Sequence, residues 1–393
     1  MRRVGDRERR SRLALRHGLA PGARFADPVT AAAAMTALHA TEAASVHLAL
    51  WARVEGVRVA DVDRALNQDR SLVKQLAMRR TLWAVPRDLH AAVLGSAAAR
   101  VAQAERRRLV KDVQAEGLAE DGERWLEGVR ELTLAQLADG VPRSVPRLRA
   151  AVPELSEKIT RGAGRWRTSI YVATPVTTVL GAQGEIVRGP NEGGWWQPRP
   201  TWVAADSWLG PREEPWPEEA GYLELVRRWL WTFGPGTEDD LVWWLGSTRT
   251  AVRRALSTLG AVQVELDGGA VGWLRPDDAE PVGEVEPWAA LLPTLDPTTM
   301  GWKGRDFHLA AEHRPRIFDS VGNAGTSAWW DGRIVGCWVQ DEEGTVRVVL
   351  HEDVGRAGTA RLDELAAGLT GWLDGTRVGN AYSSRQLKSA SLP

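Results

Sequence analysis

The sequence predicts an α+β protein in which tandem winged helix-turn-helix modules precede a C-terminal β-rich domain. Residues 234–278 show the complete order of helix, tight turn, helix and β-hairpin. Residues 28–85 and 119–203 repeat that order more loosely, and after residue 285 the pattern changes to strands closed by one helix. Helix, turn, helix and hairpin is the order of a winged helix-turn-helix, and three such modules fit the length of the chain.

Residues 234–278 are the clearest module. Thr237 is a suitable N-cap, and the acidic residues 238–240 follow it, where the helix dipole favours negative charge. Apolar residues at i, i+3 and i+4 form one stripe, and Gly246 then ends the helix. A second amphipathic helix leads into AVQVELDGGAVGWL, whose alternating valines and DGG turn predict a β-hairpin.

The first module carries the same pattern with one unusual segment. VTAAAAMTAL predicts a helix that ends at residue 38, and AASVHLALWARV predicts a helix over 43–54, so His39-Ala40-Thr41 forms a bend between two helices. A shorter helix, ADVDRALNQ, precedes two strands, SLVKQLAM and TLWAVP, which are joined at Arg79-Arg80.

The rest of the chain divides in the same way. In the second module, helices are predicted at ERWLEGVRELTLAQLADG, SVPRLRAAVPELSEKI and PVTTVLGAQ, with strands at IVRG and PTWVAA. After the linker REEPWPEE and the third module come strands within WAALLPTLDP, TSAWWDGRIVGCWV and TVRVVL, and a helix at TARLDELAAGLTGWL. We therefore expect four domains and a flexible tail, at residues 1–92, 93–211, 212–280, 281–380 and 381–393.

Composition narrows the class of protein. The net charge is −1, but residues 1–110 hold 20 Lys and Arg against 10 Asp and Glu. This basic quarter indicates either an anionic partner or a solvated basic helix face. A single cysteine excludes a disulfide framework, and no apolar run approaches the roughly 18 residues of a membrane span. We expect a cytoplasmic protein with no membrane partner.

Several common chemistries have no motif in this sequence. Phosphate-binding loops of the GxxxxGK[ST] type, HExxH and GxSxG are all absent, and the seven histidines show no metal-ligand spacing. We therefore expect no cofactor, no nucleotide and no metal. Most of the 20 tryptophans are expected to fill the core.

Two segments outside the third module suggest a family. The chain carries LALWARV…RSLVKQLAMRRTLWAVP near the N-terminus and LLPTLDPTTMGWKGRDF…IFDSVGNAGTSAWWDGRIVGCWV near the C-terminus. Together with the tandem winged helices, they resemble the winged-helix DNA-binding family of AlkZ/YcaQ-like DNA glycosylases over roughly residues 25–375. The resemblance implies excision of N7- or N3-alkylated purines, including bulky or cross-linked adducts, from duplex DNA held in a concave basic channel.

The catalytic segment departs from the pattern of that family. Members carry Gln-x-Gln or Gln-x-Asp before the LxLWxR helix, whereas this chain has His39-Ala40-Thr41. The resemblance makes His39 and Thr41 the candidate catalytic residues. An alkylated purine is already cationic, so the enzyme needs mainly to stabilise the sugar cation and hold a water. A neutral imidazole, with a usual pKa of about 6.5, and a hydroxyl can both bind that water.

A structural interpretation of the same two residues stays open. Thr41 is also a suitable N-cap for the helix at 43–54, and His39 is a residue type favoured at a helix C-terminus. Asp296, in LDP, is expected to form a turn. Candidate DNA contacts are the following basic residues: Lys74, Arg79, Arg80, Lys303, Arg305 and Arg333.

Two functions therefore remain at this point. The first is a monofunctional DNA glycosylase that acts in base excision repair or in self-resistance to a genotoxin. The second is a non-catalytic winged-helix DNA-binding protein or transcription regulator. Regulators usually dimerise to read palindromes, and the chain has no coiled-coil seam, so we expect a monomer bound to double-stranded DNA with alkylated bases.

Overall fold

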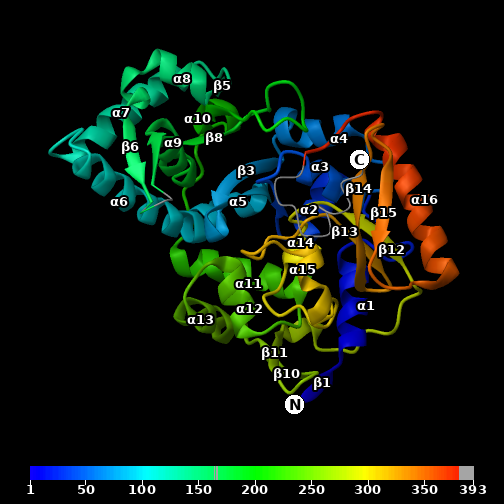
Figure 1. Cartoon of the computed structure of the whole chain (residues 1–393). Helices are drawn as coiled ribbons and strands as arrows, with labels where there is room; N and C mark the ends of the chain where they lie inside the picture. The colour runs from blue at the N-terminus through cyan, green and yellow to red at the C-terminus, as the bar shows by residue number, and fades with distance from the viewer. Residues whose placement is uncertain (163, 165–166, 380–393) are drawn as a thin grey trace.

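A three-stranded antiparallel sheet organises the first module. The computed structural model, which describes residues 1–162, 164 and 167–379, gives this sheet the order β2 (Leu38–His39), β4 (Thr81–Pro86), β3 (Leu72–Ala77). Its helices are α2 (Pro28–Ala34), α3 (Ser45–Trp51), α4 (Val59–Asp63) and a π-turn at Arg64–Gln68 (Figure 1). The two strands and the short helix predicted here are confirmed.

The segment at residues 38–41 is extended, and the predicted helix–helix bend is wrong. α2 ends at Ala34, and Thr36 adopts a left-handed φ of 63°. The Thr36 hydroxyl is buried and forms a hydrogen bond of 2.8 Å with the hydroxyl of Thr232. Thr232 belongs to a helix almost 200 residues further along the chain. Leu38 and His39 then pair with β4 and become its third strand. A contact distant in sequence, and not local propensity, decides this segment.

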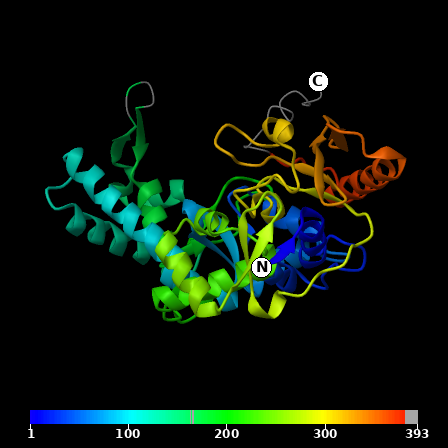
Figure 2. The ribbon, with the colours of Figure 1, turned by 90° about the horizontal axis from the view of Figure 1, so that it is seen from below.

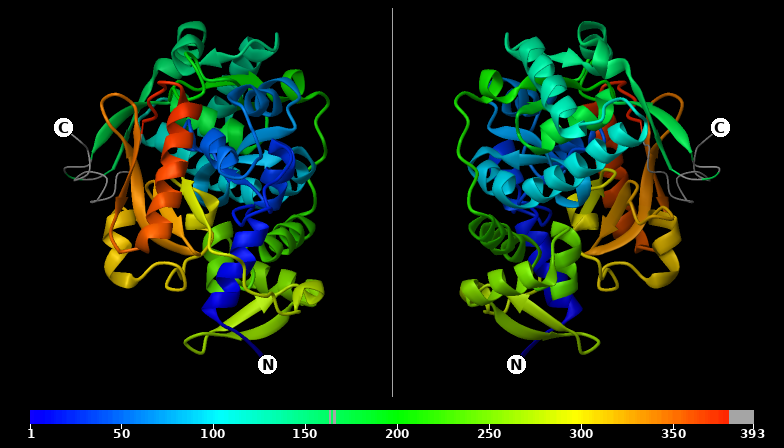
Figure 3. Two further views of the ribbon diagram at one scale, coloured as in Figure 1. Left: turned by 90° about the vertical axis from the view of Figure 1, so that its right-hand side faces the viewer. Right: turned by 90° about the vertical axis from the view of Figure 1, so that its left-hand side faces the viewer.

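The N-terminus is ordered by acidic residues of the third module. β1 (Arg2–Val4) pairs in parallel with β10 (Val262–Leu266), and α1 (Asp6–Arg16) follows it (Figure 3). Arg12 and Arg16 both form ion pairs with Asp278. These two elements are absent from our sequence prediction, because their charged residues show no apolar period and their partners lie some 260 residues further along.

The elements predicted for residues 234–278 are all present. Thr237 caps α12 (Glu238–Leu245) by accepting from Asp240 N at 3.1 Å, and Asp240 bonds back to Thr237 N at 2.9 Å. Gly246, with a left-handed φ of 61°, ends α12. The helix α13 (Arg249–Leu259) and the hairpin of β10 with β11 (Val271–Leu274) follow. The helix α11 (Glu218–Phe233), which buries one face, precedes them.

The second module has a hydrophobic core of its own. A helical run of α5 (Arg87–Val93), a π-turn (Leu94–Ala98) and α6 (Ala99–Ala115) leads into it. The helices α7 (Gly122–Leu137) and α9 (Ala173–Ala182) and the strands β8 (Ile186–Arg188) and β9 (Thr201–Ala204) match the prediction, with β5 (Arg143–Ser144) added to the sheet and α10 (Ala205–Leu209) after it.

One predicted helix of that module is partly wrong. The helix expected over residues 144–159 ends early, as α8 (Val145–Ala151), before Pro153, which has no N–H to continue it. A 3-10 turn (Pro153–Ser156) follows, and β6 (Lys158–Arg161) then pairs with β7 (Thr168–Tyr171) as a hairpin.

The C-terminal domain is the predicted sheet covered by one helix. Its strands follow chain order: β12 (Ala289–Leu292), β13 (Ser327–Trp330), β14 (Arg333–Gln340) and β15 (Val346–Leu350). The helix α16 (Gly355–Leu373) packs against them, and the short helices α14 (Pro297–Met300) and α15 (Arg314–Ile317) connect β12 to β13. Figure 2 shows this domain and the second module on opposite sides of the molecule, with the first and third modules between them.

The cores do not follow the predicted domain boundaries one for one. One core draws buried residues from the first module, the third module and the C-terminal domain together. The expected boundaries of the four domains therefore remain a prediction. Residues 211–217 are an exposed segment between modules, and the predicted tail at 381–393 lies outside the described residues. None of the described helices has the length and apolar character needed to cross a membrane.

Candidate functional site

His39 lies inside the protein at the end of β2. Its side chain is 2 % exposed, and its ring packs on Trp83 with 4.7 Å between centroids. Burial, and then the positive charge of Arg79, lower the pKa of His39 to about 3. The imidazole is therefore neutral throughout the cellular pH range. Its Nδ1 accepts a long hydrogen bond of 3.4 Å from the backbone N–H of Thr41, which leaves the ring proton on Nε2.

Thr41 is exposed, and the hypothesis that it caps a helix is wrong. The helix α3 begins at Ser45, and its N-cap is Ala44, which makes no side-chain cap. The Thr41 hydroxyl instead accepts from the backbone N–H of Leu82 on β4, at 3.2 Å. The alternative placement of His39 against the C-terminus of α2 is also wrong, because His39 belongs to the sheet. The hydroxyl hydrogen of Thr41 is left available to donate.

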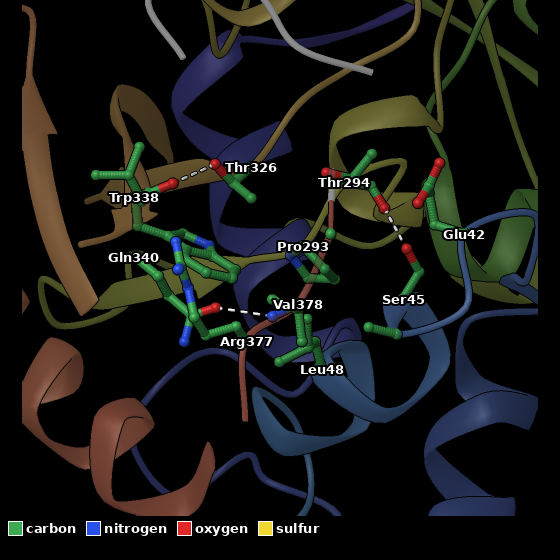
Figure 4. A pocket seen from close by; sticks show the side chains of 13 residues that line it. Glu42, Ser45, Leu48, Pro293, Thr294, Thr326, Trp338, Gln340, Arg377 and Val378 are labelled. Carbon is green, nitrogen blue, oxygen red and sulfur yellow. Dashed lines mark hydrogen bonds between the residues drawn. The ribbon is translucent and has the colours of Figure 1, made fainter. Parts of the chain in front are cut away.

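Glu42, the next residue along the chain, lines a cavity of about 230 Å³. Figure 4 shows Glu42, from the segment before α3, and Ser45, the first residue of α3, on one side of it. Trp338, Gln340 and Arg377, from the C-terminal domain, lie on the other side. It is smaller than the roughly 300–1,000 Å³ of a drug-sized pocket and suits a small fragment of a ligand. Sequence reasoning missed Glu42, although a carboxylate directly after His-x-Thr was a visible signal.

Lys74 lies on the face of the sheet opposite to His39. On β3 it is opposite Ala84, in the cross-strand row of Leu38, whereas His39 is in the row of Trp83. Adjacent rows point to opposite faces of a sheet, so Lys74 and His39 face away from each other. Burial and the nearby Arg188 lower the pKa of Lys74 to about 8.

His47 belongs to the same side of the sheet as Lys74. Its Nε2 lies 3.2 Å from Asp63 Oδ1, and its ring packs on Trp195 at 4.7 Å. Burial lowers the pKa of His47, the charge of Lys74 lowers it further, and Asp63 opposes both effects. His47 therefore lies neither in solvent nor beside His39.

The tip of the β3–β4 hairpin turns its two arginines in different directions. Arg79 and Arg80 both have left-handed φ values, 54° and 61°. Arg80 pairs with Glu105 of α6 at 2.9 Å. The Arg79 guanidinium lies over the ring of Trp243 on α12, with Cζ 4.0 Å from the ring centroid.

Of the candidate DNA contacts in the C-terminal domain, Arg305 packs on the same tryptophan as Arg79, whereas Arg333 does not. The guanidinium of Arg305 lies 5.1 Å from the same Trp243 ring. Lys303 is next to it, with Nζ 3.8 Å from Asp239. Arg333 is on β14, where it pairs with Glu352 at 3.2 Å. Among the described residues no group of His, Cys, Asp and Glu is arranged to hold a metal ion.

The buried state of His39 predicts an acid-sensitive fold. In the unfolded chain a histidine has a pKa near 6.5, so between that value and about 3 the unfolded state binds a proton that folded His39 does not. Stability from this residue is therefore lost as pH falls, by about 2 kcal/mol between pH 7 and pH 5. Urea unfolding of the parent and of His39→Gln at both pH values should show a smaller pH effect in the variant. Equal pH effects would contradict a neutral, buried His39.

Comparison with known proteins gives one family and one fold. The sequence model described as "DNA glycosylase AlkZ-like" matches residues 32–372. The solved structure of the Streptomyces sahachiroi DNA glycosylase AlkZ superposes with a TM-score of 0.72 at 19% sequence identity, over 96% of this chain and 99% of that one. No curated protein sequence matches. At that identity the superposition establishes a common fold.

Proposed function

Because the chain belongs to the AlkZ-like family of DNA glycosylases, we propose that it is a monofunctional glycosylase of alkylated duplex DNA. Its substrates are purines alkylated at N7 or N3, including bulky or cross-linked adducts. The three helix-turn-helix segments act as winged-helix modules that hold the duplex. The role is base excision repair or self-resistance to a genotoxin.

The observation that carries the proposal is the arrangement of residues 39–42. An exposed hydroxyl, held by the backbone of β4, is followed directly by a carboxylate that lines a cavity. The neutral imidazole of His39 is buried, and its Nδ1 accepts a hydrogen bond from the backbone N–H of Thr41. The segment thus combines a water-binding group with one carboxylate, and its neutral histidine adds no positive charge against a sugar cation.

The proposed reaction needs little acid assistance. The C1′–N bond breaks, and its electron pair neutralises the cationic purine. The carboxylate of Glu42 stabilises the positive charge that develops on the sugar. Thr41 holds the attacking water, whose oxygen bonds to C1′ while its proton passes to Glu42. His39 acts as a positioning residue, because it orients Thr41 and stays neutral.

Release of free base from modified duplexes tests this function. The parent protein should release N7-alkylguanine from a duplex that carries one such lesion, with the base identified by mass spectrometry. If it binds a panel of N7- and N3-alkylated duplexes and releases no base from any, the glycosylase proposal fails. A non-catalytic DNA-binding protein would then be the better description.

Thr41 gives a sharper test of the mechanism. Thr41→Val keeps the shape and removes the hydroxyl, so excision should slow by about tenfold to a hundredfold, the scale of one positioned polar group. Thr41→Ser keeps the hydroxyl and should stay within a few-fold of the parent. Single-turnover rates with protein in excess measure this, with duplex affinity as the control. Equal rates for the Val and Ser variants would remove Thr41 from the mechanism.

A further inference from the structure

Arg79 and Arg305 come from distant parts of the chain and meet on one tryptophan. Their Cζ atoms lie 4.0 Å and 5.1 Å from the centroid of the Trp243 ring. Arg305 also lies over Phe318, at 4.2 Å. Such aromatic contacts fix the plane of a guanidinium without neutralising its charge. Two cations are thus held against one aromatic ring.

Neither arginine has an acidic partner among the residues that the structure describes. The Nε atom of each is buried without a hydrogen bond. Burial lowers the pKa of both to about 10, and for Arg305 the charge of Arg79 adds to the effect. A half-buried cation pair without a counter-ion is unfavourable unless an anion binds there.

The two carboxylates that flank Trp243 on the same helix, Asp239 and Asp240, already have other partners. Asp240 Oδ1 accepts from the backbone N–H groups of Lys303 and Gly304, at 2.8 Å and 2.9 Å. Its Oδ2 accepts from Thr237. Asp239 pairs with Arg249 at 2.5 Å. Asp240 thus fixes the loop that carries Arg305, and although its charge acts on Arg305, neither Asp239 nor Asp240 forms an ion pair with either guanidinium group.

The hairpin tip that presents Arg79 is fixed before any ligand arrives. Met78 O accepts from both the Thr81 hydroxyl, at 2.8 Å, and Trp83 Nε1, at 3.2 Å. Gly246, at the turn after α12, approaches Arg79 so closely that a Cβ there would lie 2.9 Å from its backbone N. The site therefore needs little reorganisation to bind.

We infer that Arg79 and Arg305 form a binding site for one phosphate of the DNA backbone. Paired guanidinium groups suit phosphate because each can donate two parallel N–H bonds. Trp83, which packs on His39, also packs on Trp244, the neighbour of Trp243, at 5.1 Å. The phosphate is thus held next to the catalytic segment and sets which nucleotide faces Thr41. This inference rests on the proposed function for its ligand.

Methylphosphonate scanning of the duplex tests the site. One backbone phosphate at a time is replaced by its uncharged methyl analogue, and affinity for the parent protein is measured. At a single position the affinity should fall by about tenfold to a hundredfold, as for loss of a charged hydrogen bond. Arg79→Ala and Arg305→Ala should each weaken binding of the normal duplex and reduce the effect of the methyl group at that position, and the double alanine variant should be insensitive to it.

Salt dependence and matched variants complete the test. One shared phosphate contributes about 0.9 to the slope of log affinity against log salt, so the double alanine variant should lose about that much and no more. Arg79→Lys and Arg305→Lys should recover part of the affinity. Arg361→Ala, which removes an exposed arginine paired with Glu364 on α16, is the control.

The outcomes separate this inference from the proposed function. No sensitive phosphate, or alanine variants that bind like the parent, would overturn the two-arginine site, even if the parent releases base. Two sensitive positions, with a slope change twice as large, would overturn a single shared phosphate. A parent that shows the predicted phosphate effect but releases no base would leave this site intact and remove the glycosylase activity.

Discussion

Replacing Glu42 by Gln should slow base release by about a thousandfold while duplex binding changes by less than about threefold. Glu42, the residue after Thr41, lines the cavity, and neither Thr41 nor neutral His39 can supply negative charge. Gln keeps the size of the side chain but removes the charge that stabilises the sugar cation and accepts the water proton. Single-turnover release of N7-alkylguanine measures the effect.

Two further variants make that result specific. Glu42→Asp keeps a carboxylate on a shorter side chain and should retain more activity than Glu42→Gln. Glu120→Gln changes an exposed glutamate in the loop between α6 and α7 and should behave like the parent. If Glu42→Gln released base at the parental rate, Glu42 would have no role in the reaction. Thr41 and His39 would then be the remaining candidate catalytic residues.

Removing the Asp296 carboxylate should destabilise the protein by about 3–5 kcal/mol. Asp296 and Arg53 are both fully buried and form a two-bond ion pair, at 2.6 Å and 2.9 Å. Arg53 also donates to Ala49 O and to the Thr298 hydroxyl, and Asp296 accepts from Thr298 N at 2.8 Å. Asp296→Ala would leave a guanidinium charge buried and unpaired. The expected turn role of Asp296 is confirmed, because its N–H donates to Pro293 O at 3.2 Å. Its cap on α14 and the ion pair are additions.

Urea unfolding at pH 7.5 measures this loss. The control is Asp277→Ala, because Asp277 is 61% exposed in its pair with Arg275 and should cost at most about 1 kcal/mol. Combining Arg53→Met with Asp296→Leu should recover part of the stability, since an apolar pair leaves no buried charge. If the free energy of unfolding of Asp296→Ala lies within 1 kcal/mol of that of the parent, the pair does not join the residue after the C-cap of α3 to the start of α14 as tightly as its geometry indicates.

Local sequence determined much of the secondary structure of this protein. Thr237 and the acids after it predicted the start of α12, Gly246 predicted its end, and alternating valines predicted the β10–β11 hairpin. These signals work because caps, apolar periods and turns depend on residues within about four positions of one another. The family resemblance also came from contiguous segments, and the match over residues 32–372 confirms it.

Tertiary structure alone decided how the candidate site is built. His39-Ala40-Thr41 became extended because Thr36 bonds to Thr232 and β2 pairs with β4, so Thr41 binds Leu82 and caps no helix. Arg79 and Arg305 are 226 positions apart and share a tryptophan, whereas Arg333, also predicted to bind DNA, pairs elsewhere. Burial then set the charge of His39. Neighbours along the chain fix backbone propensity, but charge state, hydrogen-bond partners and convergence of side chains depend on contacts that exist only after the modules pack.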